Sequence, residues 1–439
     1  MICFPEGIVS YEFPKQGLMD IKGGFDNIVL DVGGIVECHI RHRLHLQEKG
    51  EGRLCWKWSM EHATEISDIL ASFPAVFQQQ GLRFPVARAD FLLPKPGQKE
   101  VLEDFFAPMC TLMQECVKAV GRSGCRFLVL PPFAVGIGER DKWEANRECY
   151  LSLVAIAREY GMTILLENRY RIHNGSFVRG LCSRPQEAAR WVDELNHAAG
   201  FECFGFHMDV GVCSLLGQNM HDFAVVLGQR IKAVTLRDCD GTGDAAMLPF
   251  TAVSRRGPRT DWLNLIRGLR EIAFDGMLIL NLAGTAAAMS PLLKPDLLKF
   301  ARKIADYIAW QVGMERLLKR YGKRVLFGAG NMCRAYMKCY GETYPPLFTC
   351  DNDRAKWGTE FCGLSVKDPR ELKDLPEDCA ILICNVYYRE IAQQIKDMGI
   401  KNPVGFFNDE YMPSFHFERI EEMEGENAAR DWGTDAERP

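Results

Sequence analysis

The sequence has 439 residues, which is too long for one average domain, so we expect two or three domains. With 47% hydrophobic and 25% charged residues, its composition is that of an ordinary globular protein with a sizeable core. The formal net charge of −5 disfavours nucleic-acid partners, because affinity for phosphate backbones rests mainly on Lys and Arg.

Sequence features also bear on the compartment. No run of about 18 apolar residues predicts a membrane span, and the start "MICFPEGIVSYEFPKQG" lacks the basic region and apolar stretch of a signal peptide. The 17 cysteines are scattered, without a CxxC pair or zinc-like spacing. We interpret them as buried small hydrophobic residues in a reducing cytosol, with a disulfide scaffold as the weaker alternative. We therefore expect a cytoplasmic protein without a membrane partner.

Short apolar segments alternate with helical segments over the first three quarters of the chain. Segments rich in β-branched or aromatic residues are the predicted strands: 7–13, 25–32, 83–91, 126–132, 162–168, 203–210, 231–238 and 277–283. Apolar residues spaced by three and four predict helices between them, among them 59–81, 100–124 and 145–161. Crossover helices of this kind are what parallel strands require.

This alternation predicts an α/β fold, a (β/α)8 TIM barrel over residues 1–320. An open doubly wound sheet is the alternative, because periodicity alone does not show closure. A smaller Rossmann-like parallel-sheet domain is predicted for residues 321–411, where "KRVLFGAG" begins a second βα alternation. Residues 412–439 are acidic and polar with little to bury, so we expect a flexible tail there.

Polar residues end the later strands of the predicted barrel, where TIM barrels place their chemistry. Glu167 and Asn168 end the fifth strand, and Asp209, Asp238 and Asn281 end the next three. Strand alternation places three pairs on common faces: Glu167 with Arg169, His207 with Asp209, and Thr235 with Arg237. If those faces point inward, the polar groups converge at one end of the barrel.

These strand ends carry a resemblance. The motifs "LLEN", "DVG", "VTLRDCDG", "RTDW" and "GMLILN" resemble those of the xylose isomerase-like sugar-phosphate isomerase and epimerase family, over residues 5–320. The resemblance implies E-N, D-x-G-H, H-x-K/R-D and a Glu at strands five to eight. It also implies a divalent cation held by two Glu, an Asp and a His, with the two glutamates passing protons on either side of a sugar carbon.

Carried over residue by residue, the family pattern is incomplete. Glu167 matches the first glutamate and Asp209 the aspartate. Val212 and Thr235 stand at the two histidine positions, and Asn281 stands at the second glutamate. A first-row divalent ion needs about four to six donors, so we predict a degenerate site with no metal ligand. An oxygen-only Mg²⁺ site is the alternative.

We therefore predict a sugar or sugar-phosphate isomerase/epimerase-like protein, in which Glu167 and Asp209 are the catalytic residues if it is active. We also predict that Arg169 and Arg237 stand beside these acids and replace the metal's charge, which favours binding over proton transfer. The alternatives are a structural ion-pair network and a non-catalytic sugar- and nucleotide-binding sensor or scaffold. The predicted substrate-binding residues are Asn168, Arg169, His207, Thr235, Arg237, Asp238, Asn281, Arg255 and Arg259.

A basic loop follows the seventh predicted strand, at a place where barrels often hold a phosphate. Arg255, Arg256 and Arg259 are suited to clamp such a group bidentately. The alternative is a solvated basic loop without a ligand.

The second unit carries half of a dinucleotide-binding pattern. Gly328 permits a tight turn, Gly330 lets a pyrophosphate approach a helix N-terminus, and Asp351 ends the next strand, where an acid binds ribose. We therefore predict an NAD-like nucleotide. The segment "CDNDRAKWGTEFCGLSVKDPREL" is similar to the Rossmann-like domains appended to sugar methyltransferases and glycosyltransferases, which implies nucleotide or nucleotide-sugar handling. The alternative is a domain that packs or dimerises, as in a homo-oligomer.

Overall fold

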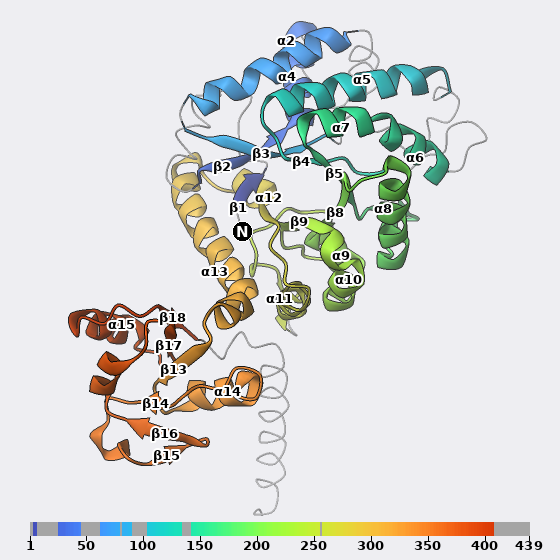
Figure 1. Ribbon diagram of the computed structural model, residues 1–439. Coiled ribbons are helices and arrows are strands. Elements are labelled where there is room, and N and C mark those ends of the chain that lie inside the picture. Colours follow the sequence, from blue (N-terminus) through green and yellow to red (C-terminus); the bar gives the residue numbers. More distant parts are fainter. Residues whose placement is uncertain are drawn as a thin grey trace, which may run out of the picture. The chain divides into compact units, whose positions relative to one another are not determined.

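The computed structural model describes residues 3–6, 25–44, 62–79, 81–89, 103–133, 142–254 and 257–407 (Figure 1). The chain divides into two compact units, Met1–Val312 and Gly313–Pro439. The division falls inside α13 (Lys294–Arg320), which runs from the first unit into the second. The predicted first strand and the predicted acidic tail lie outside the described residues. No helix in the described ranges is long and apolar enough to cross a membrane.

The first unit is built on an eight-stranded parallel sheet. In spatial order its strands are β1 (Cys3–Glu6), β12 (Met277–Asn281), β9 (Ile231–Leu236), β8 (Phe204–Asp209), β5 (Thr163–Glu167), β4 (Phe127–Val129), β3 (Arg83–Arg88) and β2 (Asn27–Asp31). Every neighbouring pair is parallel. β1 also lies against β2, so the sheet is nearly closed. This order never reverses, so it fits the predicted TIM barrel rather than a doubly wound sheet.

Helices connect successive strands on the outer side of this sheet (Figure 1). They are α2 (Val32–Leu44), α4 (Ala63–Gln78), α5 (Glu103–Arg122), α6 (Lys142–Ser152), α7 (Val154–Tyr160), α8 (Pro185–Ala199), α9 (Val210–Leu215), α10 (Met220–Leu227), α11 (Trp262–Glu271), α12 (Ala283–Ala288) and α13. Local sequence sets their ends: α8 begins with proline at its first position and ends at Gly200, which takes the left-handed conformation at φ 75°. The predicted helix over 145–161 is two helices, α6 and α7.

The strands carry two separate cores, as their two-residue period requires. Ile28 and Leu30 of β2 belong to the large core between sheet and helices. Val29, between them, belongs to a small cluster with Leu165 and Ala233 that fills the barrel interior. Each residue two positions further along β5 or β9 must therefore also face the interior. This places the polar strand ends inside the barrel.

The second unit has a six-stranded sheet. Its spatial order is β15 (Glu360–Phe361), β16 (Leu364–Lys367), β14 (Thr349–Cys350), β13 (Lys323–Phe327), β17 (Cys379–Ile383) and β18 (Val404–Phe406). Two helices of this unit are α14 (Asn331–Tyr340) and α15 (Tyr388–Asp397). β15 runs antiparallel to β16, so the sheet is mixed and not parallel as the sequence predicts. The cause is a two-residue hairpin at Cys362 and Gly363, whose φ angles of 51° and 77° are those of a type I′ turn.

The turn after β13 makes a prediction about the second unit. Gly328 has φ +121°, and a Cβ there would lie 2.6 Å from the carbonyl oxygen of Cys384. We expect Gly328→Ala to destabilise this unit by about 1–3 kcal/mol, because both the conformation and the contact oppose a side chain. Hydrogen exchange of β13 and β17 during urea titration measures this local stability.

Gly330 supplies the matched control, since a Cβ at that position meets no atom within 4 Å. Gly330→Ala replaces glycine only at the start of α14, so its cost should stay near 1 kcal/mol or below. Equal losses of protection in Gly328→Ala and Gly330→Ala would contradict the explanation based on close backbone approach.

Candidate functional site

The carboxyl ends of the barrel strands bring charged residues together inside the sheet. Leu165 and Ala233 line the interior, so Glu167 and Thr235, two residues further on, share that face. On β8 the outward residues are Phe204, Phe206 and Met208, which leaves His207 and Asp209 facing inward. The predicted grouping of the strand ends is therefore confirmed by the packing of their apolar neighbours.

Glu167 is the centre of this group and is fully buried. Arg88, at the end of β3, holds it bidentately, with Nη1 donating to Oε1 at 2.6 Å and Nη2 to Oε2 at 3.0 Å. Nη1 of Arg169 donates to Oε2 at 3.0 Å, and Nδ1 of His207 lies 3.0 Å from Oε1. Three donor groups therefore surround one carboxylate.

These contacts set the ionisation of Glu167. Burial by itself raises the pKa of this carboxyl, but the charge of Arg88, the hydrogen bond from His207 and the charge of Arg169 outweigh it, so the pKa lies well below its ordinary value. The carboxylate stays ionised, and its lone pairs are directed at donors of the protein itself. A group in this state is suited to hold charge and is poorly suited to exchange protons with a sugar carbon.

His207 connects Glu167 to the next strand. Its Nε2 lies 2.8 Å from Oγ1 of Thr235, and the ring is fully buried. Because an ionised carboxylate only accepts, Nδ1 is the donor to Glu167, and Nε2 pairs with the Thr235 hydroxyl. Thr235 stands at one of the histidine positions of the family pattern, and its hydroxyl serves the protein's own network.

Asp209 is also occupied by the protein. Nε of Arg237 donates to both carboxylate oxygens, at 2.8 and 3.0 Å, and the backbone N–H of Val212 donates to Oδ1 at 3.2 Å. Asp209 is thus the N-cap of α9, and Val212 contributes its backbone rather than a metal ligand. The predicted pairing of Arg169 with Glu167 and of Arg237 with Asp209 is confirmed by these contacts.

Other predicted residues mainly support the chain around this group. Asn168 is fully buried, and its amide exchanges hydrogen bonds of 2.7 and 2.9 Å with the backbone of Asp209. Asp238 accepts from the backbone of Ala252 and from the hydroxyl of Thr260, which organises the loop after β9. These contacts fix main-chain positions, so they explain how the strand ends are held in register.

The remaining predicted residues make local contacts. Oδ1 of Asn281 accepts from the backbone of Ala283 at 3.2 Å. Arg259 is exposed, and its Nε donates to the carbonyl oxygen of Asp240 at 2.8 Å. Arg255 and Arg256 lie outside the described residues, so the phosphate clamp stays a prediction.

Sequence reasoning missed three members of the group. Arg88 lies on the interior face of β3, two residues after Val86. Asp244, in the loop after β9, accepts from Nη1 of Arg237 and from the Tyr170 hydroxyl, the latter at 2.7 Å. Burial and the hydrogen bond to Asp244 raise the pKa of Tyr170 to about 12. Strand alternation identifies Arg88 once all eight strands are read, whereas no sequence signal marks the loop contacts.

The donor set does not fit a divalent metal ion. The described ranges contain no group of three or more His, Cys, Asp or Glu side chains placed to hold one. The oxygens of Glu167 and Asp209 face guanidinium nitrogens, which occupy the directions in which a cation would bind. Arginine supplies the positive charge at this place.

In the second unit, the acid predicted to bind ribose is held by its own domain. Asp351 accepts from the backbone of Ala329 at 2.8 Å and of Asp353 at 2.9 Å, and from Nζ of Lys356 at 3.0 Å. Burial opposes ionisation of Asp351, but these hydrogen bonds and the Lys356 charge lower its pKa. Together with Gly328, the carboxylate shapes the turn at which a nucleotide is predicted.

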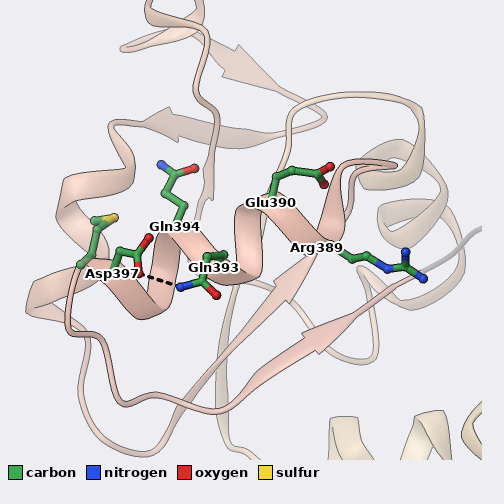
Figure 2. Close-up of a pocket in the computed structure, with 6 residues that line it drawn as sticks. Arg389, Glu390, Gln393, Gln394 and Asp397 are labelled. Carbon is green, nitrogen blue, oxygen red and sulfur yellow. Dashed lines mark hydrogen bonds between the residues drawn. The ribbon is translucent and has the colours of Figure 1, made fainter.

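A shallow depression of about 700 Å³ lies along α15 (Figure 2). Its lining residues come from one helix: Arg389, Glu390, Gln393, Gln394, Asp397 and Met398. Gln393 and Asp397 are hydrogen-bonded to each other at 2.7 Å, and Gln394 to Asn352 at 2.9 Å. The depression is open and is lined by α15 and the residue that follows it, so it lacks the convergent groups of a binding site.

Comparison with known proteins identifies the barrel. Residues 108–302 match the family model of the xylose isomerase-like TIM barrel, and residues 320–403 match the C2185-like, N-terminal model. No curated protein matches the chain. The first unit therefore contains a xylose isomerase-like TIM barrel, as the motifs predict, whereas the second unit matches a different domain model from the one expected.

Solved structures with a similar fold include sugar epimerases. A D-tagatose 3-epimerase-like protein is 14% identical over 70% of this chain and 100% of its own, with a TM-score of 0.46. A D-psicose 3-epimerase is 12% identical over 71% and 100%, with a TM-score of 0.47. A xylose isomerase domain protein from Alicyclobacillus acidocaldarius is 14% identical over 71% and 98%, with a TM-score of 0.46.

The buried carboxylate gives a prediction about stability. Glu167→Gln keeps the shape of the side chain but leaves Arg88 and Arg169 facing a neutral amide. We expect a loss of about 3–5 kcal/mol in the free energy of unfolding, because a buried charge loses its partner. Urea unfolding at pH 7 measures it. Glu159→Gln, the same change on the exposed surface of α7, should change stability by less than about 0.5 kcal/mol.

The same carboxylate makes this loss depend on pH. The native pKa of Glu167 lies below the ordinary 4.5, so its stabilisation is complete above that pH and is lost as the pH falls toward the native pKa. The stability difference between the wild type and Glu167→Gln should therefore be constant near neutrality and shrink below pH 4.5. A difference that stays constant down to acid unfolding would contradict the assigned ion pairs.

Proposed function

We propose that this protein is a sugar isomerase/epimerase-like protein whose barrel binds a sugar or sugar phosphate without a divalent metal ion. The observation that carries the proposal is the replacement of cation charge by arginine: Arg88 and Arg169 at Glu167, and Arg237 at Asp209. In the family pattern the metal neutralises these acids and orders the sugar oxygens. Here the guanidinium groups neutralise the acids directly.

The interior end of the barrel has the polar groups that such a ligand needs. Hydroxyl groups of a sugar require donors and acceptors at fixed positions in a partly dry cavity. Asp244 is partly exposed and Arg169 half-exposed, so both have surface available to a ligand. Glu167, His207 and Asp209 lie beneath them, buried and bound to one another or to arginine. The buried layer holds the exposed layer in place.

The low pKa of Glu167 favours binding without turnover, as in a sensor or scaffold. The alternative is a metal-independent isomerase or epimerase with Glu167 and Asp209 as catalytic residues. One observation favours that alternative: His207 lies between Glu167 and Thr235, which gives Glu167 a hydrogen-bonded connection along which a proton can move.

For the second unit, the proposal is a Rossmann-like domain that binds a nucleotide at the turn formed by Gly328 and Gly330. The positive φ of Gly328 and the start of α14 at Gly330 support a close approach of phosphate to backbone. Asp351 argues against a ribose contact of the NAD type, since both its carboxylate oxygens accept hydrogen bonds from its own domain.

Metal removal tests the main proposal. We expect the purified protein to bind a ligand from a panel of ketoses and ketose phosphates with the same affinity before and after EDTA treatment, because arginine supplies the positive charge. Isothermal titration calorimetry measures affinity, and mass spectrometry of the metal content measures occupancy. A stoichiometric divalent ion whose removal abolishes binding would overturn the proposal.

Turnover distinguishes the catalytic alternative. If Glu167 passes protons, wild-type protein converts a member of the ketose phosphate panel and Glu167→Gln loses at least about 100-fold in kcat, the ordinary contribution of an acid/base group. We expect no conversion by either protein. Turnover that persists unchanged in a folded Glu167→Gln variant would instead assign the chemistry to other residues.

A further inference from the structure

The charges at the interior end of the barrel are unevenly distributed. Two guanidinium groups, those of Arg88 and Arg169, contact the carboxylate of Glu167. Two carboxylates, those of Asp209 and Asp244, contact the guanidinium of Arg237. Positive side chains therefore gather around Glu167 and negative ones around Arg237.

Of the two arginines that contact Glu167, Arg169 is the more exposed and donates fewer hydrogen bonds to it. Arg88 is largely buried, with its side chain 14% exposed, and gives both terminal nitrogens to Glu167. Arg169 is 36% exposed and gives Nη1 alone. In the ranges that the structure describes, its Nε and Nη2 have no acceptor. Arg169 thus presents two donors that Glu167 does not engage.

The main chain holds Arg169 in position. Its N–H donates to the carbonyl oxygen of Leu181 at 2.9 Å, and its carbonyl accepts from the N–H of Gly180 at 3.0 Å. A Cβ on Gly180 would lie 2.6 Å from that carbonyl oxygen, so glycine permits the close approach. These bonds fix the base of the hairpin formed by β6 (Tyr170–His173) and β7 (Ser176–Arg179). A donor fixed in this way loses little entropy on binding.

We propose that Arg169 binds an anionic group of the carbohydrate ligand, a carboxylate or a phosphate. The inference rests on the proposed carbohydrate-binding function and names the class of ligand: an acidic or phosphorylated sugar rather than a neutral one. The planar guanidinium matches the oxygens of both anions, and two of its three nitrogens are not engaged by Glu167. The hydroxyl groups of the same ligand reach toward the acidic half, where Asp244 and Tyr170 lie.

Sugars that differ in charge test whether the site prefers an anionic ligand. We would titrate the full-length protein with D-fructose, D-fructuronate and D-fructose 6-phosphate, and with inorganic phosphate alone. The expected result is that at least one of the two charged sugars binds about tenfold or more tightly than D-fructose, the ordinary effect of one charge-assisted hydrogen bond. Comparing D-fructuronate with D-fructose 6-phosphate and with inorganic phosphate distinguishes a carboxylate from a phosphate.

Three variants test the residue. Arg169→Gln should remove the preference for the charged sugar, while Arg88 still holds Glu167. Arg169→Lys should restore part of the preference, because it keeps the charge but lacks the planar fork. Arg171→Gln removes an exposed arginine from the same hairpin and should have no effect.

The outcomes separate the two proposals. Equal affinity for neutral and charged sugars, or a preference that survives in Arg169→Gln, overturns the anionic subsite and leaves carbohydrate binding intact. Failure of every sugar to bind the wild type overturns the proposed function and the subsite together. Loss of the preference in Arg171→Gln as well would show a general field effect and would also overturn the assignment to Arg169.

Discussion

The structure of the barrel's interior end depends on burying one carboxylate. An ionised carboxylate removed from water costs several kcal/mol, and the cost is offset only when charged donors satisfy its oxygens. Glu167 meets this condition through Arg88, Arg169 and His207, which come from three different parts of the barrel. The Arg88–Glu167 pair therefore couples β3 to β5, which are not neighbours in the sheet.

The same interactions limit the chemistry that Glu167 can perform. Donors that stabilise a buried carboxylate also lower its pKa, so the stability of the site and proton exchange by Glu167 make opposite demands. A metal ion escapes this conflict because it keeps open positions for substrate oxygens and polarises them as a Lewis acid. Arg88 donates from both terminal nitrogens to the carboxylate of Glu167. Those nitrogens therefore leave no open position for a substrate oxygen. If arginine takes the place of a metal ion, as we propose, the positive charge is preserved and the polarising power is lost.

The sequence predicted the part of this site that follows from strand periodicity. Alternation placed Glu167 with Arg169 and His207 with Asp209 on common faces, because a period of two is a geometric property of every strand. It did not predict the contact between Tyr170, at the start of β6, and Asp244, on the loop after β9, because no period links residues 74 positions apart. Nor did it predict that the side chain of Asn168 binds the backbone of Asp209. An asparagine at a strand end looks the same in the sequence whether its amide binds a sugar or the main chain.

The second unit shows the same ambiguity in another fold. Asp351 stands where an acid contacts ribose in dinucleotide-binding folds, yet Ala329, Asp353 and Lys356 take up its oxygens. Glu167 ends β5 and Asp351 directly follows β14. The carboxylate oxygens of both residues accept hydrogen bonds from backbone or basic groups of their own unit. An acid at a strand end therefore indicates a ligand site only when lone pairs remain. In the barrel the group with unused donors lies beside the acid, and that group is Arg169.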